Sequence, residues 1–199
     1  VILVALGAYL KDSGQMSNET IDGAGMGLVV IYVIVFLYLF LWLGVSLLTL
    51  IKNRNTELTA EQVSEQTKPM IGQFFWTGFL SGLLTTFGFI LLIIPGIIFW
   101  VWYSFAQNIY VDKGVKGYDA LKLSKKYVEG LWWPVFRALI ALMVISILVN
   151  IVTEIATVVG GEIASGVVSV IILIVFTPYS FIYTWLVYEK LKALKPEVQ

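Results

Sequence analysis

Long apolar runs alternate with short polar stretches along the chain, and their lengths predict membrane-spanning helices. Residues 26–51 form one run without a charged side chain. A bilayer needs about 20 apolar residues per helix, so this run fits one tilted span. Residues 71–111 form a second run that is too long for one helix. Proline breaks the helical ladder and glycine permits a tight turn, so we expect a hairpin turn at Pro95 and Gly96.

The same reasoning divides the rest of the chain. The expected elements are a partial span at 1–10, full spans at 26–51, 71–94, 97–111, 131–159 and 163–188, and an amphipathic helix at 117–129. The last two spans are separated by Gly160 and Gly161, which predict a turn. The sequence therefore predicts an all-α, polytopic transmembrane helical bundle in a single domain over residues 1–199. Five full spans and the N-terminal partial span would make a six-helix plan of three hairpins.

Composition agrees with a membrane protein and excludes several kinds of chemistry. Hydrophobic residues make up 59% of the chain and charged residues 13%, with a mean hydropathy of +0.89, whereas soluble domains carry about 25% charged residues. The net charge is zero, so no basic field favours nucleic acid binding. The chain contains no histidine and no cysteine. We therefore expect no histidine-based catalysis, no thiolate metal site and no cofactor.

Basic residues predict the orientation of the bundle, because short loops rich in Lys and Arg stay in the cytoplasm. Three cytoplasmic segments are expected on this basis: the loop after residue 51, the stretch 113–126, and the C-terminal tail. The turns at 95–96 and 160–161 carry no basic residue and are expected on the opposite side. The predicted topology is multi-pass with a cytoplasmic C-terminus.

Residues 117–129 combine an apolar face with a charged face at helical spacing. The apolar positions are Ala120, Leu121, Ser124, Tyr127 and Val128. This pattern predicts a short helix that lies on the cytoplasmic membrane surface. On its polar side, Lys122, Lys125 and Lys126 are candidates for contact with anionic lipid. The alternative is that the helix only anchors the chain before the next span.

A stripe of polar residues marks the span 131–159. Its members recur every three or four residues and are Ser146, Asn150, Thr153, Glu154 and Thr157, with Glu162 just beyond the turn. Ionisable groups within a membrane are candidates for function, so one interpretation is a polar vestibule in which Glu154 binds a proton or cation. The alternative is hydrogen bonding between helices, with Glu154 reaching the outer interface.

These patterns leave three functions open. The first is a non-enzymatic module that binds membrane lipids, a membrane protein partner or a second copy through faces such as Gly78-x-x-x-Gly82. The second is a small transporter or channel that uses the polar stripe. The third is an enzyme acting on lipid headgroups, with Glu154 and Glu162 as metal ligands, although such a site needs more convergent ligands than these two. We expect the first.

An ordered set of short motifs resembles a known family. The motifs are Ile94-Pro95-Gly96-Ile97, Tyr103-Ser104-Phe105-Ala106, Asp119-Ala120-Leu121-Lys122-Leu123-Ser124, Gly130 and Trp132-Trp133. Over residues 71–145 this pattern resembles the membrane domain of glycerophosphoryl diester phosphodiesterases and of related prokaryotic integral membrane proteins.

The resemblance implies a six-helix domain in the prokaryotic cytoplasmic (inner) membrane, often standing alone without an assigned activity. Phosphodiesterase activity is not expected. In that family it belongs to a separate soluble barrel with acidic and histidine catalytic residues, and this chain has no histidine.

Overall fold

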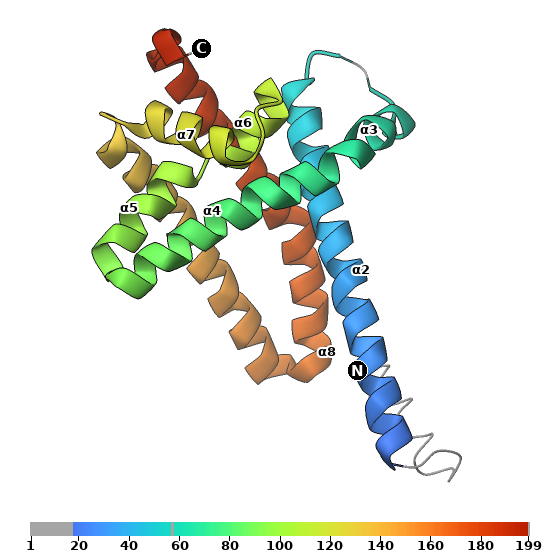
Figure 1. Ribbon diagram of the computed structural model, residues 1–199. Helices are drawn as coiled ribbons and strands as arrows, with labels where there is room; N and C mark the ends of the chain where they lie inside the picture. Colours follow the sequence, from blue (N-terminus) through green and yellow to red (C-terminus); the bar gives the residue numbers. More distant parts are fainter. Residues whose placement is uncertain (1–17, 57, 199) are drawn as a thin grey trace. The chain divides into compact units, whose positions relative to one another are not determined.

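The computed structural model describes residues 18–56 and 58–198, with the side chains of residues 18–26 and 162 left aside. All regular elements in these ranges are helical (Figure 1). They are α2 (Asn18–Lys52), α3 (Ala60–Thr67), η1 (Lys68–Met70), α4 (Ile71–Leu91), α5 (Ile93–Tyr103), α6 (Ala106–Lys113), α7 (Gly117–Val128), α8 (Trp132–Leu194) and η2 (Pro196–Val198). The all-α prediction is confirmed for the described residues. The expected partial span at 1–10 lies outside them.

Four helical segments are long and apolar enough to cross a membrane: Gly27–Lys52, Ala60–Leu91, Trp132–Gly161 and Ile163–Leu194. The chain divides into two compact units, Val1–Leu43 and Gly44–Gln199. In the first unit, the described side chains of α2 from Leu28 to Phe40 are exposed and apolar. Such a helix, apolar on all sides, is suited to lipid surroundings.

The turn expected at Gly160 and Gly161 is present. Gly161 has φ 69° and ψ −166°, and this single residue breaks α8 into two helical arms. A positive φ is readily adopted only by glycine, which explains why the turn falls there.

The hairpin expected within residues 71–111 is also present, but its turn was misplaced. The extended residue is Leu92 (φ −165°, ψ 153°), whereas Pro95 and Gly96 lie in the first turn of α5. Proline is tolerated there because the first N–H groups of a helix have no partner within the helix. Gly96 instead permits close packing, since a Cβ added to Gly88 would lie 2.9 Å from the Gly96 Cα.

Residues 97–111, expected as one span, do not form one continuous helix. Helix α5 ends at Tyr103, and α6 begins at Ala106 after a break at Phe105 (φ −103°, ψ 5°). The Ser104 hydroxyl donates to the Trp100 carbonyl at 2.7 Å, one turn earlier in α5. A serine that bonds back in this way competes with the regular ladder and favours a bend.

Helix α7 matches the amphipathic pattern, but its surroundings differ from the expectation. The five predicted apolar-face residues, Ala120, Leu121, Ser124, Tyr127 and Val128, are all fully buried. They pack against protein, because α7 contacts α4, α5, α6 and α8. The apolar face of α7 therefore forms part of the core and does not rest on lipid.

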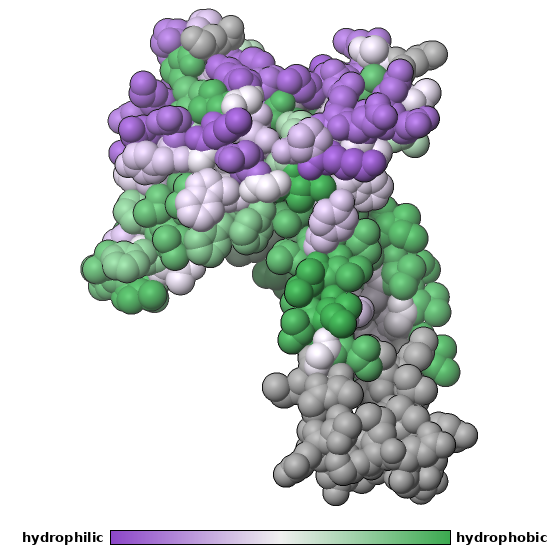
Figure 2. Space-filling view, turned by 45° about the vertical axis from the view of Figure 1, so that its right-hand side comes forward, coloured by the Kyte–Doolittle hydropathy of each residue, from purple (hydrophilic) through white to green (hydrophobic). Residues whose placement is uncertain are grey.

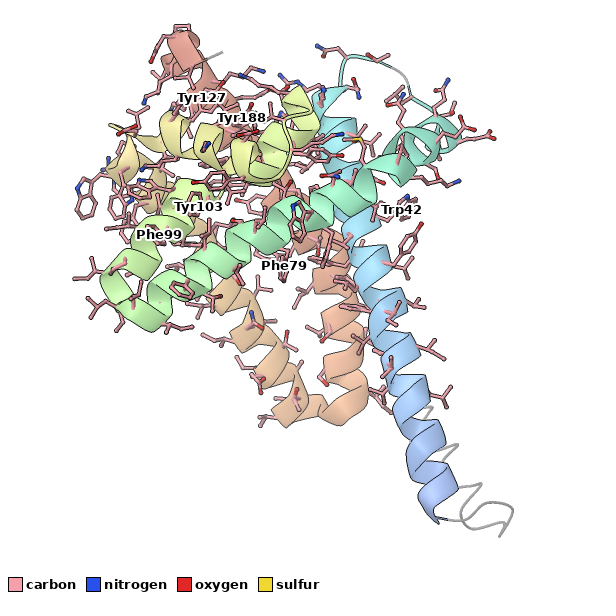
Figure 3. All side chains as sticks on the ribbon, in the orientation of Figure 1. Trp42, Phe79, Phe99, Tyr103, Tyr127 and Tyr188 are labelled. Carbon is pink, nitrogen blue, oxygen red and sulfur yellow. The ribbon has the colours of Figure 1, made fainter. Side chains whose placement is uncertain are left out.

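This core lies at the polar end of the second unit. The rings of Tyr127 and Tyr188 (Figure 3) meet edge to face, with centroids 5.8 Å apart. The Phe105 ring stacks on Tyr188 at 6.4 Å. In Figure 2, hydrophilic residues gather around α3, α6, α7 and the C-terminal turns of α8, above hydrophobic surface. The second unit thus has one hydrophilic end held together by an aromatic core.

Charged side chains close the hydrophilic end. The Lys52 ammonium donates to the carbonyls of Val111 and Asp112 at 2.9 and 2.7 Å, so it satisfies the last turn of α6. Arg54 pairs with Glu189 at 2.9 Å. The ends of α2, α6 and α8 are therefore tied together in one layer.

Candidate functional site

An open groove of about 580 Å³ lies between α5, along most of its length, and the start of α8. Helix α5 lines it with Ile94, Ile97, Ile98 and Trp102, the α7–α8 connection with Glu129 and Gly130, and α8 with Trp132, Trp133 and Phe136. Its walls are almost entirely apolar apart from Glu129. A concave apolar site with few polar groups is typical of a ligand pocket.

Local sequence explains how these side chains come to face one groove. The α5 residues recur at intervals of three and four and so share a face of that helix. Gly130 (φ 78°) makes the sharp connection that starts α8 beside α5. The Trp132 ring stacks on Phe136, with centroids 4.9 Å apart and an angle of 11°, while Trp133 meets Trp132 edge to face at 5.0 Å. Three packed rings make this wall stiff.

Two hydrogen bonds hold α7 against the end of α5, where Trp102 lines the groove. The Ser124 hydroxyl of α7 donates to the Trp102 carbonyl at 2.6 Å and accepts from the Phe105 amide at 3.3 Å. These bonds satisfy backbone groups at the break between α5 and α6. They also place α7 directly above Trp102.

One of the three candidate lysines is thereby brought to the groove. The Lys125 ammonium lies 4.2 Å from the centroid of the Trp102 ring, a cation–π contact. The two other lysines have different surroundings. Lys122 pairs with Asp119 at 3.8 Å on the exposed face, and Lys126 is exposed there.

The C-terminal tail contacts the end of α7 beside the groove. Lys195 donates to the carbonyls of Lys126 and Glu129, the first at 2.8 Å. A lysine at the carbonyl end of a helix complements both its unpaired acceptors and its dipole. Lys195 is therefore occupied in capping α7, whereas the polar contact of Lys125 is with a ring.

A second polar observation concerns the groove wall itself. The Trp132 Nε1 donor is buried and has no hydrogen-bond partner in the described structure. An indole N–H usually finds an acceptor when it is buried. Because this nitrogen has almost no accessible surface, it belongs to the packed wall and offers no polar contact to the groove.

The structure does not join the polar stripe into a site. Asn150 donates to the Ser146 carbonyl at 2.8 Å, Thr153 to the Val149 carbonyl at 3.4 Å, and Thr157 to the Thr153 carbonyl at 3.0 Å. All three bonds stay within α8. Glu154 is exposed on this helix, and the side chain of Glu162 lies outside the described residues. In the described ranges no three acidic side chains converge to hold a metal ion.

The sequence pattern predicted neither the groove nor the ion pairs that link helices at the hydrophilic end. Asp112 accepts from Lys192 at 2.6 Å and from the Tyr188 hydroxyl at 2.8 Å. The acid–lysine pairs at Asp112-Lys113 and Glu189-Lys190 were the available signal for these ion pairs. The groove had no comparable signal, because its two walls come from separate helices.

Comparison with known proteins adds no relative. No family model, no curated protein and no solved structure matches this chain.

Proposed function

We propose that this chain is an integral membrane protein that binds a membrane lipid in the groove between α5 and α8, without catalysing a reaction on it. The proposal depends on one observation: the apolar groove and a lysine ammonium share the ring of Trp102. An apolar groove of about 580 Å³ ends at Trp102, and the Lys125 ammonium lies over that same ring. An acyl chain along the groove would bring its headgroup to a cation.

Energetics favour recognition of the headgroup over recognition of the tail. An acyl chain already lies in hydrocarbon, so moving it into an apolar groove gains little hydrophobic free energy. Basic residues near the surface contribute about 1 kcal/mol each towards anionic lipid. We therefore propose an anionic phospholipid as the ligand, with Lys125 nearest its phosphate. Lys122 and Lys126 would add a weaker field.

The proposal also covers the membrane that holds this site and the side on which its hydrophilic end lies. Lys and Arg at the end of α2 and just after it, and on η1, α6, α7 and the tail, support a cytoplasmic position for the hydrophilic end. The resemblance over residues 71–145 supports the prokaryotic cytoplasmic (inner) membrane. A membrane protein partner or a second copy remains the alternative occupant of the exposed apolar surfaces.

Native mass spectrometry of the full chain, extracted in its own lipid patch without detergent, tests this function. We expect one anionic phospholipid to be retained in stoichiometric amount. Lys125→Gln should weaken its retention several-fold relative to Lys190→Gln, which removes an exposed lysine elsewhere. Trp133→Ala should lower retention of any lipid, whereas Phe87→Ala, which removes a ring outside the groove, should not.

Two results would contradict the proposal. Equal retention of zwitterionic and anionic lipids in both lysine variants would remove the role of Lys125. A stoichiometric protein partner with no retained lipid would identify the chain as an accessory subunit of that partner.

A further inference from the structure

The α4–α5 hairpin is apolar at its tip, and neither of its helices contains a charged residue. Its tip side chains stand clear of the protein, with Ile90 75% and Ile94 71% exposed. Residues 87–99 contain no charged and no polar side chain. A turn that reached the aqueous phase would hold these aliphatic groups in water, which is unfavourable. The tip is therefore suited to hydrocarbon.

Helix α7 contacts both arms of the hairpin and brings charged side chains beside them. On the α4 side, the Gly117 amide donates to the Thr77 hydroxyl at 3.1 Å. On the α5 side, Ser124 binds the Trp102 carbonyl and Lys125 lies over the Trp102 ring. Helix α7, with its charged face, therefore lies beside Thr77 on the α4 arm and beside Trp102 on the α5 arm.

The hairpin beyond these contacts is short. At about 1.5 Å per residue, Trp102 lies about 15 Å from Leu92 along α5, and Thr77 lies about 22 Å from Leu92 along α4. Both lengths are smaller than the hydrocarbon thickness of about 30 Å, even for an upright hairpin. By contrast, the first arm of α8, Trp132–Gly161, is about 45 Å long and suffices to cross. The segment Ala60–Leu91, which contains α4, reaches about 48 Å only when the residues before Thr77 are included. Figure 1 shows α4 running obliquely and the hairpin ending well short of the kink in α8.

The turn is built for surroundings without water. Irregular backbone within a bilayer needs its polar groups satisfied by the protein. The Leu92 amide donates to the Gly88 carbonyl at 3.0 Å, and the Leu92 carbonyl accepts from the Gly96 amide at 3.2 Å. Pro95 has no N–H, so it removes one of the unpaired donors at the start of α5. The single non-helical residue therefore has both of its backbone groups paired.

We propose that the α4–α5 hairpin enters the membrane from the side of α7, ends near the midplane and returns without crossing. Its partners are the acyl chains of that one leaflet. Within the described residues, the chain then crosses the membrane three times, through α2 and the two arms of α8. Two crossings are removed, so the turn at 95–96 no longer reaches the opposite side, and the other loops keep their predicted sides. The groove, which Ile94 and Ile97 line, opens into the same leaflet. This inference rests on the hairpin and holds whether or not the groove binds lipid.

Single cysteines in the full chain test the depth of the hairpin, because the chain has no cysteine of its own. Leu92→Cys probes the tip. Val159→Cys, beside the kink in α8, and Lys126→Cys, on α7, mark the two membrane surfaces. Each variant is treated with an impermeant maleimide in right-side-out cells and in inverted vesicles, and total cysteine is measured after denaturation in detergent. All three side chains are exposed, so the substitutions remove little packing.

We expect Val159→Cys and Lys126→Cys to be labelled from opposite sides and Leu92→Cys from neither. A nitroxide attached at Leu92 should show the largest ratio of oxygen to aqueous nickel collision rates of the three. Labelling of Leu92→Cys from the side of Val159 would overturn the proposal, and so would a nitroxide depth equal to that at Val159. Labelling of Leu92→Cys from the side of Lys126, or of both reference sites from one side, would overturn it as well.

Discussion

The Asp112 carboxylate of α6 accepts from the Lys192 ammonium of α8 at 2.6 Å, although the two residues are 80 positions apart in the sequence. The same Asp112 oxygen accepts from the Tyr188 hydroxyl at 2.8 Å. The Asp112 side chain is only 12% exposed. This pair is therefore the most protected ion pair in the described structure, and it connects two helices that also enclose the aromatic core.

Asp112→Asn should destabilise the protein measurably. The change removes the negative charge that Lys192 faces in a partly buried position. Loss of one partner from a fully buried pair costs about 3–5 kcal/mol, and the partial exposure of Lys192 reduces this to about 1–3 kcal/mol. Thermal unfolding followed by circular dichroism measures the effect. Asp119→Asn is the matched control, because its exposed pair with Lys122 should contribute less than about 1 kcal/mol.

Gly88→Ala should weaken the α4–α5 hairpin. The new Cβ would lie 2.8 Å from a ring carbon of Phe99 and 2.9 Å from the Gly96 Cα, so the two helices would have to separate. Overpacking of this kind costs about 1–3 kcal/mol. Gly82→Ala, on the same helix, meets nothing within 4 Å and should be neutral or slightly stabilising. Equal melting temperatures for the two variants would contradict the close approach of the helices.

Ser124→Ala should loosen α7 from α5. The variant leaves the Phe105 amide and the Trp102 carbonyl without their partner at a fully buried position, which costs about 1–3 kcal/mol. Hydrogen exchange at the Phe105 amide should increase, and this readout is specific to the lost bond. Ser169→Ala, at an exposed position of α8, should change neither stability nor exchange at Phe105.

Glu154→Gln should leave the fold intact. Glu154 is exposed, and substitutions at such sites usually stay within about 0.5 kcal/mol. The melting temperature should therefore equal that of the parent chain. A large loss of stability would instead assign Glu154 a structural role and weaken the case for a proton or cation site on the stripe.

The sequence pattern predicted which segments are helical and which face of a helix is apolar. It predicted less well what those faces contact. The buried face of α7 agrees residue by residue with the predicted apolar face. Its location does not, because an apolar stripe is equally compatible with lipid and with protein. Pro95 and Gly96 mark the hairpin but not its turn, since proline also fits the first turn of a helix.

The groove could not be predicted from the sequence pattern alone. Ile94 and Phe136 lie on different helices, and no periodicity reports that α5 will end beside the start of α8. The polar stripe illustrates the opposite case. Asn150 and Thr157 have the spacing of a shared face, but their side chains bond to carbonyls of their own helix, which spacing alone does not reveal.

Lys52 has one consequence for how the protein is made. Its positive charge ends the first long apolar run and can stop that helix during insertion. Its two carbonyl partners belong to α6, and they are synthesised 59 and 60 residues later. On the predicted topology, the lysine would serve first as a topological signal, while the nascent chain is short, and only afterwards as a helix cap. A substitution at this position would act at two separate times in biogenesis, and pulse-chase insertion assays would separate the early defect from the late one.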